Sequence, residues 1–495
     1  MAILSLAQVR PLLTPSFLPH RFTSGTLGHS PSQRSESGIR AFAGEKTHFG
    51  ARDSETGGKN GLSMKVNLPV RTGLFSAGLQ VSALAAGLAT TILLARILGA
   101  EGYGIYVFAY ASIALLAIPV QAGLPMLVLR ETAKFDSIPD FAGMKGLWKW
   151  ASLIALFGGV TAVFLGATVA ALLLGYQEKA FLVGLALIPL IALSELRSAA
   201  LKGLGHVIYG QFPDLVLRPV LLAVFLIAAT LVLENVRPET AMTLHVVVAI
   251  ISFTVGATIL FVLAPDGLSG VRGNTGHWRV WLMSIIPMGT SSAIQVLNVN
   301  LGAVLLGMLS VSEDVSLFRI AFMVANLLMF GQVAIIAVVQ PRLTRAHYSG
   351  DREHLQSLAS WVSAVSLAVM LTLVTIMIFW GQSIISIVFG AEFRGVWPLV
   401  LIMATGQTVN ATLGSVGSVL MMTGHERKAM HMLVMTTCLS LPTYFVLITL
   451  WGAIGAAIAN ALTTTVLHLM YWWGAKRVLN VDCSAIYYFV SGRKF

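Results

Sequence analysis

Residues 73–106 read GLFSAGLQVSALAAGLATTILLARILGAEGYGIY, and this stretch decides the class of fold. From Gly73 to Ala95 it carries no charged side chain. A helix needs about 20 apolar residues to cross a hydrocarbon core of about 30 Å, so this run is long enough. Arg96 and Glu101 then mark a polar turn before the next apolar run. The stretch therefore predicts the first helix of a membrane protein.

The composition of the whole chain extends this prediction. Of 495 residues, 56% are hydrophobic and only 11% are charged, whereas soluble domains carry roughly 25% charged residues. A soluble globular protein is thereby excluded. The net charge of +11 is spread over short loops rather than gathered in one block, so no nucleic-acid partner is expected. Two cysteines, Cys438 and Cys483, provide neither a disulfide framework nor a metal cluster.

Twelve apolar stretches approach membrane length, and each is predicted to be a transmembrane helix. They cover residues 73–95, 105–125, 150–175, 180–197, 214–233, 241–263, 281–309, 315–340, 358–380, 397–422, 431–450 and 453–474. The loops after even-numbered stretches and the C-terminal tail hold seventeen Lys and Arg residues, and the odd-numbered loops hold four. Cytoplasmic segments are enriched in these residues. Both termini are therefore predicted to lie in the cytoplasm.

The first 70 residues differ from the rest because they contain no apolar run of membrane length. We expect residues 1–70 to form a disordered leader. Arg10, Arg21 and Arg34 precede the first acid, Glu36, which is also typical of an organellar transit peptide. A transit peptide is the alternative for this segment.

The chain also resembles itself. Glu101, Tyr106 and Arg130 recur as Glu313, Phe318 and Arg342 at an offset of 212, and LKGLGH (201–206) recurs as LMMTGH (420–425) at an offset of 219. With six helices per copy, equivalent helices run in the same direction, which makes a parallel repeat. The predicted domains are an N-terminal six-helix lobe (71–265), a cytoplasmic linker (266–280), a C-terminal six-helix lobe (281–475) and a cytoplasmic tail (476–495).

Four motifs resemble those of a known family. ARILGAEGYGIY (95–106), LKGLGHVIYGQFPDLVLRP (201–219), FGAEF (389–393) and MMTGHER (421–427) are similar to sequences of the bacterial polysaccharide and O-antigen flippases. The resemblance covers residues 73 to about 475. It implies the multidrug, oligosaccharidyl-lipid and polysaccharide exporter superfamily, with its MATE-like fold of two six-helix lobes around a cavity that opens alternately to each side. It also implies a cargo of glycan linked to a lipid diphosphate.

Ionisable groups inside membrane spans usually face a cavity or one another. Arg319 lies within the eighth predicted span and is the main candidate for binding a diphosphate. The alternative is that it extends outward and pairs with Glu313 or Asp314. Arg96 ends the first span and is a second candidate for substrate contact. The alternative is that it anchors the helix end or pairs with Glu101.

Polar residues on the seventh span provide further candidates for a cavity that binds sugar hydroxyls; hydrogen bonding between helices is the alternative. They are Ser291, Gln295, Asn298 and Asn300, and the first span adds Gln80. Gln407 and Asn410 on the tenth span are weaker candidates.

Three charged residues are candidates for a gate at the cytoplasmic rim. Asp214 and Arg218 lie four residues apart, which would place them on one helical face as an ion pair. Arg197 closes the fourth span at the same rim. A structural ion pair is the alternative to a gate for these groups.

The sequence offers no catalytic constellation, no metal site and no cofactor motif; His245 and His468 are isolated in apolar helices. We therefore expect a transporter rather than an enzyme, namely a flippase of lipid-linked oligosaccharide or polysaccharide precursors in the inner (cytoplasmic) membrane. Its expected partners are the lipid-linked glycan and the lipid bilayer, with a polysaccharide polymerase and glycosyltransferases of O-antigen or lipopolysaccharide synthesis as further ones. A cation-coupled multidrug extruder and a non-transporting scaffold of a polysaccharide assembly complex are the alternatives.

Overall fold

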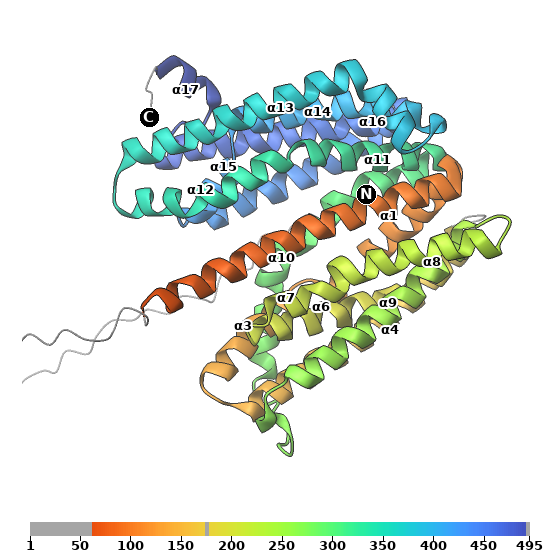
Figure 1. Ribbon diagram of the computed structural model, residues 1–495, viewed down its shortest axis with the longest axis vertical. Coiled ribbons are helices and arrows are strands. Elements are labelled where there is room, and N and C mark those ends of the chain that lie inside the picture. The colour runs from red at the N-terminus through yellow and green to blue at the C-terminus, as the bar shows by residue number, and fades with distance from the viewer. Residues whose placement is uncertain (1–61, 174–177, 492–495) are drawn as a thin grey trace, which may run out of the picture. The chain divides into compact units, whose positions relative to one another are not determined.

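The computed structural model describes residues 62–173 and 178–491, and from Met64 onward the chain forms one compact unit. Within these described ranges every regular element is a helix (Figure 1). Residues 1–61 of the predicted leader and residues 492–495 of the predicted tail lie outside the described residues.

The first half of the chain supplies the helices up to the predicted linker. They are α1 (Leu62–Leu116), α2 (Ile118–Gln121), α3 (Leu124–Ser137), α4 (Phe141–Leu173), α5 (Glu178–Gly184), α6 (Leu187–Gly203), α7 (Val207–Phe212), the π-helix η1 (Pro213–Leu217), α8 (Arg218–Val232), α9 (Pro238–Leu263) and the 3₁₀-helix η2 (Asp266–Leu268).

The second half of the chain follows the same pattern of long helices with short breaks. Its elements are α10 (Trp278–Leu309), α11 (Ser312–Leu328), α12 (Phe330–Tyr348), α13 (Arg352–Val388), η3 (Ala391–Gly395), α14 (Val396–Leu413), α15 (Val416–Met422), α16 (Glu426–Leu479) and α17 (Ala485–Ser491).

Nine helical stretches of the described residues are long and apolar enough to cross a membrane. Two of them, Gly78–Leu116 and Glu426–Leu479, are each kinked at one glycine with non-helical torsion angles, Gly99 (φ 68°) and Gly452 (φ 53°). Division at these kinks gives eleven segments, and the remaining predicted span, 315–340, falls on α11 and α12, which meet at Met329. The predicted all-α polytopic membrane fold is confirmed.

The internal repeat is visible in the backbone. The helix after the Gly99 kink begins at Ala100 and α11 begins at Ser312, which reproduces the offset of 212. At the offset of 219, Gly205 (φ 83°) and Gly424 (φ 77°) both adopt the left-handed conformation that glycine permits. The amide of His206 donates to Leu201 O at 2.8 Å, and that of His425 donates to Leu420 O at 2.9 Å. This is the same helix-ending turn in both copies.

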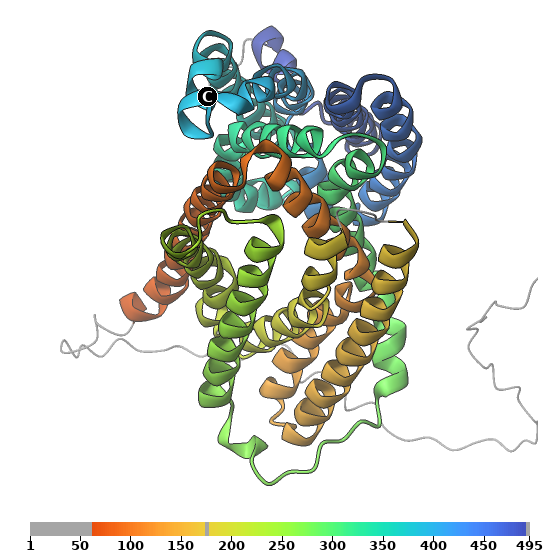
Figure 2. The same ribbon diagram turned by 90° about the vertical axis from the view of Figure 1, so that its right-hand side faces the viewer.

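The helices pack in two groups. In the first half α6 contacts α3, α4 and α9, and in the second half α14 contacts α11, α13 and α16 (Figures 1 and 2). The helix α10 touches both groups, because it packs against α2 and α3 and also against α11 and α16. A Cβ atom on Gly123 would lie 2.3 Å from Ile285 O, so this crossing of α3 and α10 depends on glycine.

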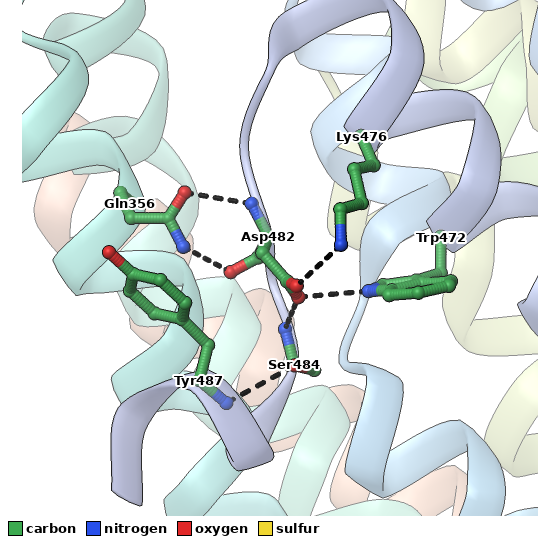
Figure 3. Close-up of polar contacts among 6 residues, drawn as sticks. All are labelled: Gln356, Trp472, Lys476, Asp482, Ser484 and Tyr487. Carbon is green, nitrogen blue, oxygen red and sulfur yellow. Dashed lines mark hydrogen bonds and ion pairs between the residues drawn. The ribbon is translucent and has the colours of Figure 1, made fainter. Parts of the chain in front are cut away.

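The segment after α16 is held by a polar cluster around Asp482 (Figure 3). The Gln356 side chain on α13 exchanges two hydrogen bonds with the Asp482 backbone, accepting from its amide at 2.7 Å and donating to its carbonyl. The Asp482 carboxylate accepts from Trp472 Nε1 at 2.9 Å and from the Ser484 amide at 3.1 Å, and it lies 3.5 Å from Lys476 Nζ. The start of the predicted tail is thereby fixed to α13 and α16.

This cluster should make attachment of the tail depend on pH. Burial raises the pKa of Asp482, but hydrogen bonds from Trp472 and Ser484 and the Lys476 ammonium outweigh it, so the pKa lies below its ordinary value. A lowered pKa in the folded state contributes stability that is present above the unfolded pKa of about 3.9 and is lost as the pH falls through the folded value. Because the carboxylate is partly exposed, we expect at most about 1 kcal/mol.

Asp482→Asn should therefore speed hydrogen exchange of residues 480–491 a few-fold at pH 7. Deuterium uptake measured by mass spectrometry tests this, with Asp136→Asn on the exposed side of α3 as the control. Equal uptake by Asp482→Asn and the unmodified protein at pH 7 would contradict the role of the carboxylate.

Candidate substrate cavity

A cavity of about 320 Å³, here called the arginine cavity, lies where the two groups of helices meet. Its charged lining residues are Asp214, Arg218 and Arg319. The rest of its polar lining comes from α1, α9 and α10, namely Thr90, Thr91, Tyr103, Tyr106, Tyr110, His245 and Asn300. Residues from six helices or helical turns therefore surround one cationic space.

Arg319 on α11 is half-buried in this wall. Its Nη1 makes one long hydrogen bond, 3.4 Å, to the carbonyl of Val299 on α10. Among the described residues it forms no ion pair with Glu313 or Asp314. Asp314 instead accepts hydrogen bonds from the Ser310 hydroxyl and from the Ala453 amide at 3.3 Å. The outward-pairing alternative for Arg319 is therefore not what the structure shows.

Arg218 is the second cation of the cavity. Its Nε and Nη2 are buried and have no hydrogen-bond partner among the described residues. The predicted ion pair between Asp214 and Arg218 is wrong, because Asp214 pairs with Arg197 on α6. Asp214 belongs to the π-helical turn η1, whereas the prediction assumed an α-helical register. Arg218 thus keeps donors available for a ligand.

His245 takes no such role. Its Nδ1 shares a 2.5 Å hydrogen bond with the hydroxyl of Tyr106, and its ring stacks against Tyr106 and Tyr110. His245 therefore has the contacts of a partnered core residue.

A second cavity of about 610 Å³, here called the amide cavity, lies within the second half of the chain. No Asp, Glu, Lys or Arg lines it within the described residues. Its carboxamides are Asn298, Asn326, Gln332, Gln340, Gln407, Asn410 and Asn460, and Tyr444, His468 and Tyr471 add rings. Each carboxamide offers both donors and an acceptor, so the surface suits an uncharged polyhydroxyl ligand.

The helix α10 contributes to both cavities. Asn300 lines the arginine cavity, and its side-chain amide donates to Val296 O at 2.8 Å. The side-chain oxygen of Asn300 takes no part in that bond. Asn298 lines the amide cavity and donates to Thr437 Oγ1 at 3.1 Å. Residues two apart on a helix point to roughly opposite sides, which explains the division.

The remaining predicted site residues lie elsewhere. Gln295 and Gln80 are exposed, Ser291 is half-buried, and none of the three lines a cavity described above. Arg96 donates from Nε to Val388 O at 2.8 Å and from Nη2 to Ile387 O, at the end of α13. Arg96 therefore has the contacts of a helix anchor.

Comparison with known proteins agrees with this architecture. No family model and no curated protein matches the sequence. An inward-facing multidrug resistance MATE family transporter of the MOP superfamily superposes with a TM-score of 0.67 at 15% identity, covering 81% of this chain and 95% of that one. The lipid II flippase MurJ, in an inward closed conformation, gives 0.65 at 13% identity, covering 81% and 87%.

A third similar structure is a MOP superfamily transporter from Pyrococcus furiosus, with a TM-score of 0.55 at 14% identity, covering 81% of this chain and 94% of that one. These neighbours are transporters or flippases rather than enzymes. The chain is therefore a multi-pass membrane protein with the fold of the MOP superfamily transporters.

Proposed function

We propose that the protein moves a lipid-linked oligosaccharide or polysaccharide precursor across the cytoplasmic membrane by alternating access. The observation that carries the proposal is a cavity with two arginines, Arg218 and Arg319, together with a separate cavity lined by uncharged amides. A lipid-diphosphate glycan needs both kinds of surface, because its diphosphate is anionic and its sugars are rich in hydroxyl groups.

The charges of the arginine cavity favour an anionic cargo over a cationic one. An uncompensated charge inside a membrane costs at least several kcal/mol. Arginine offers phosphate a fixed charge and forked donors. Of the described residues in the lining, Asp214 is the one acid, and it is already paired with Arg197. A cation-coupled multidrug extruder would need carboxylates there, so the site supports the flippase over this alternative.

Contacts at one end of the molecule support alternating access. Arg96 on α1 bonds to the end of α13, and the Ala100 amide donates to Glu392 Oε2 at 3.3 Å. A Cβ atom on Gly104 would lie 1.7 Å from Ser312 O, so the two halves touch closely there. The charge distribution of the loops predicts that this end is external, and opening on that side would have to break these contacts.

The proposal also includes the partners of the protein. The lipid bilayer presents the lipid-linked glycan to the cavities, while an O-antigen or lipopolysaccharide pathway would add a polymerase and glycosyltransferases as partners. The similarity to the lipid II flippase MurJ supports a lipid-linked cargo.

A reconstituted transport assay tests the function. The full chain in liposomes should expose a fluorescent polyprenyl-diphosphate oligosaccharide from the inner leaflet to an external quencher, above the rate in protein-free liposomes. Efflux of a cationic dye in its place would favour the extruder. Transport of neither compound by folded protein would favour the scaffold.

The orientation of the chain in the membrane gives a separate prediction. The bias of seventeen basic residues against four predicts that Lys145 lies in the cytoplasm and Arg237 outside. Cytoplasmic and external activity reporters fused after these two residues should give opposite responses. The same response at both positions would contradict the proposed topology.

A further inference from the structure

A third cavity, which the proposed transport does not use, lies among the helices of the first half. It has a volume of about 900 Å³ and is called here the α4–α6–α9 pocket. Lys145 lies near the start of α4, Ala200 near the end of α6 and Leu260 near the end of α9, and all three line it. The pocket therefore sits at the end of the bundle where these three helix termini meet.

Three cations line this pocket. Lys145 Nζ donates to Leu268 O at 3.0 Å, which places this ammonium at the pocket's loop side. Lys149 lies eight residues after the start of α4, and Arg197 lies six residues before the end of α6. At a rise of about 1.5 Å per residue, both lie on the order of 10 Å from those ends. Lys149 and Arg197 are thus at similar depths.

Arg197 carries unused donors in this wall. Its side chain is only 3% exposed, and Nη2 pairs with Asp214. Its Nε and Nη1 are buried with no hydrogen-bond partner among the described residues. A Cβ atom on Gly256 of α9 would lie 0.9 Å from Nη1, so glycine is what admits the guanidinium there. A buried charged donor without an acceptor is costly, and an anionic ligand would relieve that cost.

Apart from one acid, Asp266, and the hydroxyl residues Ser152 and Ser269, the rest of the lining is mainly apolar and continues to the lipid-facing surface. Phe253, Leu260 and Phe261 of α9 line the pocket, and Phe261 is 85% exposed. In a membrane protein an exposed phenylalanine on a spanning helix contacts acyl chains. Trp148 lies at the cationic end, and tryptophan prefers the depth of lipid headgroups. The pocket thus combines cations on α4 and α6 with an apolar wall on α9 that reaches the lipid-facing surface.

We infer that the α4–α6–α9 pocket binds an anionic glycerophospholipid of the bilayer. Its phosphate accepts hydrogen bonds from Lys149 and Arg197, with Lys145 adding charge, and one acyl chain lies along Phe253, Leu260 and Phe261. Basic pockets between membrane helices are a recurring site for such lipids. The inference does not depend on the cargo, because the two arginines assigned to the diphosphate, Arg218 and Arg319, do not line this pocket.

Lipid binding to the full-length protein in detergent, without any glycan, tests the inference. Native mass spectrometry should show phosphatidylglycerol bound at about tenfold lower concentration than phosphatidylcholine with the same acyl chains. Lys145→Ala/Lys149→Ala should abolish most of that preference, since each basic side chain near a membrane surface contributes measurably to attraction of anionic lipid. Phosphatidylglycerol should also raise the melting temperature of the unmodified protein more than that of the variant.

Arg427→Ala/Lys428→Ala is the matched control, because it removes two exposed cations from the first turn of α16, outside the pocket. It should keep the preference for phosphatidylglycerol. Equal binding of the two lipids, or equal loss in both double variants, would overturn the inference. Binding of a polyprenyl diphosphate but not of phosphatidylglycerol would also overturn it and would assign the pocket to the cargo. If lipid binding is intact but the protein does not transport the glycan, the proposed function is contradicted and the lipid site is supported.

Discussion

Arg319→Ala and Arg218→Ala should each reduce transport of a polyprenyl-diphosphate oligosaccharide by at least about tenfold. Hydrogen bonds to charged groups contribute about 1.5–3 kcal/mol each, and 1.4 kcal/mol corresponds to a factor of ten. Both guanidinium groups line the arginine cavity, and two nitrogens of Arg218 are buried without a partner. Removal of either arginine leaves the diphosphate with half of its charge compensation within the membrane.

Lysine variants separate charge from geometry. Arg319→Lys and Arg218→Lys keep the cation but lose the forked pair of donors, so we expect partial transport in both. If the two arginines bind the same diphosphate, the double alanine variant should lose less than the product of the two single losses. Initial rates in liposomes, normalised to reconstituted protein, provide the measurement.

Arg237→Ala is the control for these variants, since Arg237 is exposed and lies 3.9 Å from Glu239 outside the cavities. It should transport like the unmodified protein. If Arg319 served only to pair with external acids, Glu313→Ala/Asp314→Ala would reproduce Arg319→Ala, mainly through lower protein abundance. Normal transport by well-folded Arg319→Ala would contradict its role in binding the diphosphate.

The sequence predicts the fold well because its signals are local and periodic. Each predicted span contains enough apolar residues to cross lipid, and the helix-ending turns at Gly205 and Gly424 follow from a repeat of short motifs. The kinks at Gly99 and Gly452 were not predicted as such. The sequence signal of a glycine between two apolar runs is the same whether the glycine ends a helix or bends a continuous one.

The sequence predicts the candidate site only in part. Arg319 could be selected because a charge within a span is rare. Arg218 was assigned to the rim, since nothing in the sequence signals the π-helical turn that precedes it. Gln295 is a candidate because it is polar and lies within a span, but the sequence does not say which helix covers its face. The contact between Gln356 and Asp482 joins residues 126 apart and has no periodic signal.

Asp214→Ala should destabilise the protein by about 3–5 kcal/mol, because it leaves the Arg197 charge buried without its partner. The Arg197 side chain is 3% exposed and that of Asp214 is 22% exposed, so water replaces the lost carboxylate poorly. Thermal unfolding in detergent, followed by intrinsic fluorescence, should show a large drop in melting temperature. The melting temperature of Asp214→Asn should lie between those of Asp214→Ala and the unmodified protein, since asparagine keeps an acceptor for Arg197.

The double variant Arg197→Met/Asp214→Leu decides whether the loss comes from an unpaired charge. Replacement of a whole buried pair by apolar residues is often neutral or stabilising, so this variant should melt above Asp214→Ala. Glu239→Ala breaks the exposed pair with Arg237 and should cost at most about 1 kcal/mol. If the double variant melts as low as Asp214→Ala, the loss reflects packing of η1 rather than charge. In that case packing of η1, and not the ion pair with Arg197, would keep Asp214 from pairing with Arg218 or Arg319.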